Sequence, residues 1–181
     1  MAVDYGPLTG FVGVWQGDQG TDLSPEPDAD EQSAYYERLE FESAGDVDNA
    51  DSQELVMLRY NQVVMRKRND EVFHNEAGFL IWDAERELVM QSFAIPRGLS
   101  VVAGGTATAS VGVVTISLQA AADDAQWKIS QAPFLEEHAQ TTGFVRNYRL
   151  EGDTLSYDQL MTIDIYNRSV AHTDKNVLTR C

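Results

Sequence analysis

The stretch VFHNEAGFLIWDAERELVMQSFAIPRGLSVVAGG, residues 72–105, decides the fold class of this chain. Apolar and polar residues alternate with a period of two, which is typical of β-strands, and turn-forming segments interrupt the pattern at 83–86 and 95–98. We therefore expect three consecutive strands joined by tight turns. His74 and Glu76 stand two residues apart, on one face of the first of these strands.

The same pattern continues on both sides of this stretch. It predicts roughly ten short strands at intervals of about 8–12 residues, with little helix and no internal repeat. Because strands that follow one another in sequence tend to pair, we expect an all-β, antiparallel, up-and-down barrel of the calycin or lipocalin type, with a ligand inside. The further expected strands lie at 11–16, 33–43, 54–67, 106–118 (a pair), 127–130, 141–150, 154–163 and 176–180.

Composition limits the class of protein. The 181 residues are enough for one domain, which we expect to span 1–181. The formal charge of −16 argues against binding to nucleic acids or to anionic membranes. Cys181 is the one cysteine, so the sequence excludes an internal disulfide and a cysteine metal cluster. No apolar run is long enough for a membrane span, and we expect a cytoplasmic protein.

Few residues carry recognisable chemistry. Phosphate-binding loops, dinucleotide fingerprints, nucleophile elbows and zinc-protease helices are all absent from the sequence. Of the three histidines, we expect His138 to be exposed and inert, and His74 to line a cavity or to make a structural hydrogen bond. His172 begins the segment His-Thr-Asp-Lys, residues 172–175, which could be a turn. The basic residues 66–68 are interpreted as balancing the acidic surroundings or capping a sheet edge, in preference to an anion site.

A set of motifs in a fixed order resembles the nitrobindin family, the THAP4-like haem-binding β-barrels that are similar to fatty-acid-binding proteins. The similarity spans nearly the whole chain, and the ordered set is more specific than any one motif. The motifs are GVWQG at 13–17, YERLEF at 36–41, FHNEAGF at 73–79, YRL at 148–150, LSY at 155–157, His172 and LTR at 178–180.

The resemblance implies a haem site at the barrel mouth. His172 matches the proximal ligand of the haem iron, and His74 matches a histidine on the distal side. The cofactor would be haem b. Family members also have a short helix near one end of the barrel, bind nitric oxide, and are credited with isomerising peroxynitrite to nitrate. The chain would be an enzyme in that sense only if it binds haem.

The resemblance also assigns residues around the cofactor. Gly13, Trp15 and Gly17 match the glycine-tryptophan signature near the entrance, and Phe79 and Met161 would supply apolar walls. All five belong to the predicted cofactor-binding set.

Two alternatives stay open. The family has an apolar His-Leu-x-Ala where this chain has the polar His-Thr-Asp-Lys of residues 172–175. The chain could therefore belong to a sister branch that carries a fatty-acid-like ligand, with Arg97 or Arg146 binding the acidic headgroup. Alternatively, His74 and Glu76 could act as an acid/base pair of a small-molecule enzyme. Across these interpretations we expect the binding partner to be haem or a small hydrophobic molecule. A homodimer is left open.

Overall fold

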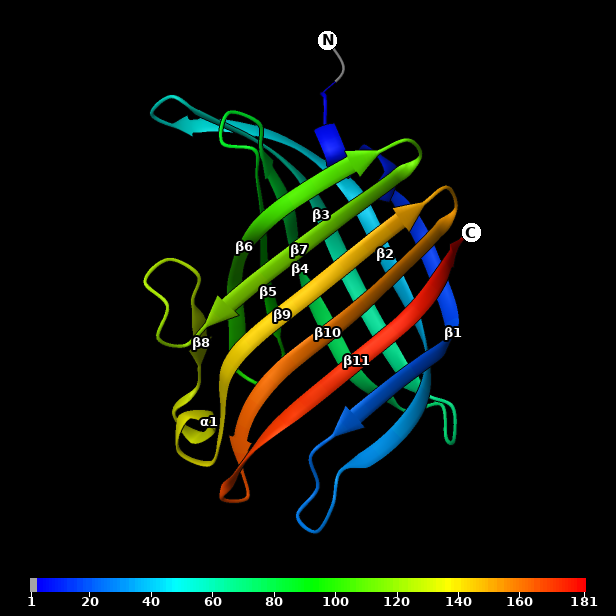
Figure 1. The fold of residues 1–181 in the computed structure, drawn as a ribbon, viewed down its shortest axis with the longest axis vertical. Coiled ribbons are helices and arrows are strands. Elements are labelled where there is room, and N and C mark those ends of the chain that lie inside the picture. The colour runs from blue at the N-terminus through cyan, green and yellow to red at the C-terminus, as the bar shows by residue number, and fades with distance from the viewer. Residues whose placement is uncertain (1–2) are drawn as a thin grey trace.

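The computed structural model describes residues 3–181, which form a closed antiparallel β-barrel (Figure 1). Ten strands make the ring in the order β5-β4-β3-β2-β1-β11-β10-β9-β7-β6, and pairing of β5 with β6 closes it. The short strand β8 adds to the edge of β6. The predicted up-and-down barrel is confirmed. The elements are η1 (Gly6–Phe11), β1 (Gly13–Ser24), β2 (Glu31–Ala50), β3 (Gln53–Arg66), β4 (Val72–Asp83), β5 (Leu88–Ile95), β6 (Leu99–Ser110), β7 (Val113–Ala121), β8 (Ile129–Gln131), α1 (Pro133–His138), β9 (Ala139–Glu151), β10 (Thr154–Ile165) and β11 (Arg168–Arg180).

The end of the barrel that is uppermost in Figure 1 is filled with apolar side chains. Leu8 and Phe11 of the 3-10 helix η1 are fully buried there. Trp15 donates a hydrogen bond from Nε1 to the carbonyl oxygen of Phe11 at 2.8 Å, and the guanidinium of Arg180 lies 4.1 Å from its ring centroid. This end is therefore a packed core. Neither helix among residues 3–181 is long and apolar enough to cross a membrane.

The middle of the barrel holds a buried polar network. The Arg146 guanidinium donates to both carboxylate oxygens of Glu76, at 2.7 and 3.0 Å. The hydroxyl of Tyr60 also donates to Glu76, at 2.5 Å, and Gln91 donates to the hydroxyls of Tyr60 and Tyr148. These side chains fill the interior at the level where a lipocalin-like barrel would hold its ligand.

The glycines of β1 mark a bend. The pairing of β1 with β2 shifts register between Gly17 and Gly20. A Cβ atom on Gly20 would lie 2.1 Å from the ring of Tyr35, and one on Gly17 would lie 2.5 Å from the carbonyl oxygen of Val177. Glycine is required at both positions because neighbouring atoms already occupy the space of a side chain.

Three sequence predictions need correction. The last strand begins at Arg168 rather than at 176, because the reversal occurs at Tyr166 and Asn167, both with positive φ. The interpretation of 172–175 as a turn is therefore wrong. The third strand expected within 72–105 does not end at that boundary, since β6 continues through Gly104 and Gly105 to Ser110. The short helix that the family resemblance implies is α1, with Pro133 in its first turn.

Candidate functional site

A small pocket opens at the lower end of the barrel in Figure 1, where β1 and β3 end and β4 and β11 begin. Its volume is about 120 Å³. His74 and His172 both line it, as do Asp22, Asp174 and Arg66. The sequence placed the two histidines 98 positions apart, and the fold brings them to one cavity. The full lining is Asp22, Ser24, Gln62, Val64, Arg66, Phe73, His74, Arg146, Tyr157, Gln159, His172 and Asp174.

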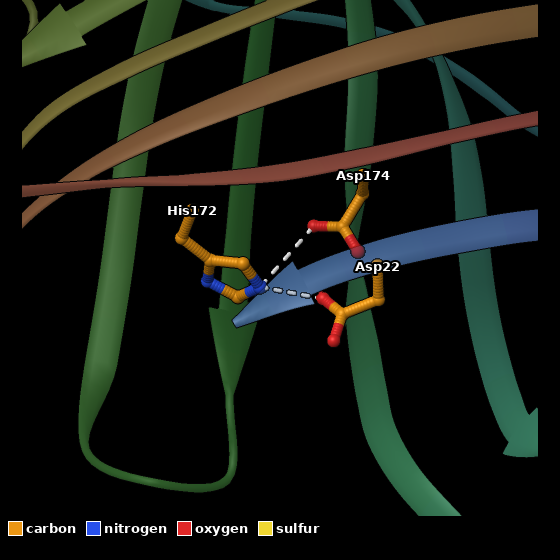
Figure 2. Close-up of side chains that lie close together, drawn as sticks. All are labelled: Asp22, His172 and Asp174. Carbon is orange, nitrogen blue, oxygen red and sulfur yellow. Dashed lines mark hydrogen bonds and ion pairs between the residues drawn. The ribbon is translucent and has the colours of Figure 1, made fainter. Parts of the chain in front are cut away.

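One side of this pocket, the mouth pocket, is a cluster of Asp22, His172 and Asp174 (Figure 2). Asp22 on β1 and Asp174 on β11 are direct cross-strand partners, and His172 stands two residues before Asp174 on the same inward face. The imidazole Nε2 lies 2.7 Å from Asp22 Oδ1 and 3.7 Å from Asp174 Oδ2. Gln159 donates to the carboxylate of Asp174 at 3.0 Å.

The three groups shift one another's protonation. Burial disfavours the imidazolium, yet the hydrogen bond with Asp22 and the negative charge of Asp174 outweigh it and raise the pKa of His172. Burial, helped by the charge of Asp22, raises the pKa of Asp174 to about 7. Burial also opposes ionisation of Asp22, but hydrogen bonds with His172 and Asp174 prevail and lower its pKa. A protonated His172 donating to Asp22 has no free lone pair on Nε2.

His74 lines the mouth pocket, and Glu76 lies buried behind it. His74 Nε2 lies 3.4 Å from Glu76 Oε2, with 23% and 1% of the two side chains exposed. Burial disfavours the carboxylate of Glu76, but the charge of Arg146 overcomes this and holds the pKa of Glu76 well below its usual range. Glu76 is therefore a permanently ionised structural partner, which makes it a poor proton acceptor for the predicted acid/base pair.

Arg66 forms the outer wall of the mouth pocket. Its guanidinium lies 4.3 Å from the ring centroid of Phe73 and 3.5 Å from the carboxylate of Glu71. The Nε atom of Arg66 is buried and has no hydrogen-bond partner among the described residues. A buried N–H without an acceptor costs about 1–3 kcal/mol, so Arg66 Nε is an unsatisfied donor in this wall.

Most of the predicted cofactor-binding residues lie elsewhere. Gly13 and Trp15 lie at the opposite end of β1 from Asp22, where Trp15 belongs to the packed core, and Gly17 lies at the bend of β1. Phe79 points outward and is 39% exposed, because His74, Glu76 and Leu80 occupy the inward positions of β4. The prediction that Phe79 forms an inner wall is wrong.

Met161 is buried inside the barrel as the cross-strand partner of His172, but its side chain does not line the mouth pocket.

The two arginines considered for an acidic headgroup are also unsuitable. Arg146 is 2% exposed and already forms an ion pair with Glu76, while Arg97 is exposed in the turn between β5 and β6. His138 is exposed at the end of α1, as expected.

Comparison with known proteins identifies the relatives of this barrel. The model of the THAP4-like, heme-binding beta-barrel domain matches residues 4–180. The chain belongs to this family. The predicted family membership is thus confirmed.

A solved structure supports the fold of this THAP4-like barrel. The crystal structure of Rv2717c from M. tuberculosis superposes with a TM-score of 0.74, at 24% sequence identity, over 98% of this chain and 99% of that one. At that identity the likeness concerns the fold alone. No curated protein is similar enough in sequence to count as a relative.

The family description names haem, but the mouth pocket of this THAP4-like chain does not fit that group. Its volume of about 120 Å³ is well below the roughly 300–1,000 Å³ of pockets that enclose larger organic ligands. Its walls carry ionisable side chains where a porphyrin needs apolar faces. In addition, His172 Nε2 is engaged with Asp22 at 2.7 Å. The residues present do not fit an enclosed, histidine-ligated haem.

A larger hollow lies outside the barrel. It measures about 640 Å³ and is lined by residues of β6, β7, β9, β10 and β11, among them Thr108, Ser117 and Asp158. These side chains point outward from the sheet and are exposed. The hollow is a shallow open surface and does not replace the interior cavity that the barrel shape had predicted.

Sequence reasoning missed Asp22. Asp22 comes just before the acidic segment 24–31, so its charge looks like ordinary surface polarity. The signal that could have found it is the alternation of inward and outward residues along β1. Trp15 points inward, but the bulge between Gly17 and Gly20 shifts the alternation by one residue, so that Asp22 also points inward. A bulge cannot be placed from periodicity alone.

Proposed function

We propose that this chain is a small-ligand-binding barrel whose ligand is a compact polar molecule or ion held in the mouth pocket. The observation that carries the proposal is the combination of size and chemistry, because a volume of about 120 Å³ is lined by two histidines, two aspartates and two arginines. Membership of a ligand-binding barrel family supports the general role. The polar lining supports a ligand different from haem or a fatty acid.

The orientation of the wall groups suggests how such a ligand is held. The buried Nε of Arg66 offers one unused donor, and His74 borders the same space with 23% of its side chain exposed. These donors would bind an oxyanion such as a carboxylate. The opposite wall, formed by Asp22, His172 and Asp174, would bind a positively charged or metal-linked part.

A thermal-shift titration tests this proposal. Formate, acetate and sulfate serve as compact polar probes and dodecanoate as the apolar comparison, with Arg66→Gln as the variant and Arg68→Gln as the control. Arg68 is exposed and paired with Glu31, outside the mouth pocket. We expect at least one compact anion to raise the melting temperature of the wild type and of Arg68→Gln, but less so that of Arg66→Gln. Stabilisation by dodecanoate alone would overturn the proposal.

Haem is the competing candidate, because the family is described as heme-binding. It would supply nitric oxide and peroxynitrite chemistry at a ferric iron, with His172 as the ligand. This candidate requires His172 to leave Asp22 and the mouth to widen. Protein isolated from cells grown with ample haem precursor would then show a Soret band without any addition, whereas our proposal expects none.

A further inference from the structure

The geometry of Asp22, His172 and Asp174 points to a binding site for a divalent transition-metal ion, which we propose to be Zn²⁺ or a cation of similar preference. This inference rests on the proposed function, since it names the ion held by the acidic wall of the mouth pocket. It concerns a mononuclear site formed by protein side chains and involves no haem.

The donor atoms already lie close together. One ligand atom from each of the three residues falls within 4.8 Å of the others. In a tetrahedral zinc site with bonds near 2.1 Å, ligand atoms are about 3.4 Å apart. The distances from His172 Nε2, 2.7 Å to Asp22 and 3.7 Å to Asp174, lie on either side of that value. The cation would replace the Nε2 proton that joins His172 to Asp22, and small side-chain adjustments would then suffice to surround it.

The backbone fixes this arrangement. Asp22 and Asp174 face each other across the β1–β11 ladder, and His172 is the next inward residue on β11. Side chains at such positions on a barrel wall are held by two strands each, which is the kind of support that metal sites need. Figure 2 shows the imidazole edge and both carboxylates turned toward one point.

A second layer of hydrogen bonds orients the carboxylate of Asp174. Gln159 Nε2 donates to it at 3.0 Å, and Gln159 Oε1 accepts a hydrogen bond from Arg146 Nε at 2.8 Å. Arg146 is in turn fixed by Glu76. Metal ligands are commonly held in this way by amides and carboxylates behind them.

The charges on this wall favour a cation. The side chains of Asp22 and Asp174 are 3% and 18% exposed, and His172 is the one basic group that pairs with them among the described residues. Two neighbouring carboxylates in a partly dry site repel each other unless positive charge lies between them. Arg146 lines the same pocket, but its charge is directed to Glu76. A divalent ion would neutralise the pair.

The donor set selects the class of metal. One imidazole and two carboxylates suit Zn²⁺, Mn²⁺ or Fe²⁺ better than Mg²⁺ or Ca²⁺, which prefer oxygen ligands alone. Three protein ligands leave at least one coordination position open, as in catalytic rather than structural zinc sites. That position would face the mouth pocket and the buried Nε of Arg66, where a compact anion could complete the coordination.

Calorimetric titration of the full chain tests the site. Protein stripped with a chelator is titrated with Zn²⁺, and with Co²⁺ as a spectroscopic probe of nitrogen coordination. We expect one Zn²⁺ per chain, binding tighter than Mg²⁺, and a loss of affinity of about 10- to 100-fold or more in Asp22→Asn, in Asp174→Asn and in His172→Gln. His138→Gln is the matched control, since His138 is exposed beside Glu137 and away from the mouth pocket.

The outcomes separate the two proposals. Circular dichroism and melting temperature establish that each variant is folded, and any one folded variant suffices for the comparison. Absence of one-to-one Zn²⁺ binding by the wild type, or equal binding by the folded Asp22→Asn and His172→Gln variants, would overturn the metal site. The anion titration with Arg66→Gln is read independently, so a metal-free pocket that still binds a compact anion leaves the proposed function standing.

Discussion

Replacing Arg146 with methionine removes the cation that neutralises Glu76 inside the barrel. The two side chains are 2% and 1% exposed, and two hydrogen bonds of 2.7 and 3.0 Å join them. Removing one partner of a buried ion pair costs about 3–5 kcal/mol, because the remaining charge stays buried without compensation. For a chain of this size each kcal/mol lowers the melting temperature by about 2–4 °C. We therefore expect Arg146→Met to melt roughly 6–20 °C below the wild type.

The deficit should depend on pH in a defined direction. In the wild type, burial opposes ionisation of Glu76 but Arg146 lowers its pKa, so the pair contributes stability above the unfolded pKa near 4.3. Without Arg146, burial raises the pKa of Glu76 instead, and protonation relieves the uncompensated charge at low pH. The stability difference should therefore be larger at pH 8 than at pH 5.

Urea unfolding followed by circular dichroism measures this difference. The control is Arg59→Met, since the ion pair of Arg59 with Glu42 has 65% and 50% exposed side chains and should be worth less than about 1 kcal/mol. The double variant Glu76→Gln/Arg146→Met keeps an acceptor for the hydroxyl of Tyr60 and should regain most of the loss. A loss in Arg146→Met no larger than in Arg59→Met, or equal at both pH values, would refute the reasoning.

Two further predictions concern packing at glycine positions and Glu37, another buried carboxyl group. Gly105→Ala should lose about 1–3 kcal/mol or more, because its Cβ would lie 1.8 Å from the carbonyl oxygen of Ser117. Gly143→Ala, with 3.3 Å to its nearest neighbour, should lose less in the same urea experiment. Burial raises the pKa of Glu37 despite its hydrogen bonds, so wild-type stability should fall as pH rises from the unfolded value near 4.3 through the folded pKa. Glu37→Gln should lack this fall. If its stability depends on pH in the same way as that of the wild type, the fall does not come from the raised pKa of Glu37.

The fold was predictable because strand alternation is a local signal. The segment 72–105 contains three strands whose inward and outward residues follow the expected period, and the structure has β4, β5 and the start of β6 there. The prediction failed at β11, where His172 and Asp174 take inward positions that are normally apolar. A polar residue on an inward face gives the same sequence pattern as a turn, so the first half of that strand was missed.

The candidate site was only partly predictable. His74 and His172 were identified through the family resemblance, and they do line one pocket. Asp22 contacts His172 across 150 residues of sequence, and nothing in the local pattern shows which of the 29 acidic residues reaches it. Phe79 was misplaced because its neighbours are apolar on both faces of β4, so that hydrophobicity alone does not identify the inward face.

The central claim is that the mouth of this barrel is a compact polar pocket in which His172 is held by Asp22 and Asp174. Titration of the purified chain with hemin, followed by absorbance, tests it most directly. We predict that wild type and His172→Ala give the same spectrum, without a Soret band that depends on the imidazole. A one-to-one Soret band in the wild type that disappears in a folded His172→Ala variant would contradict the claim.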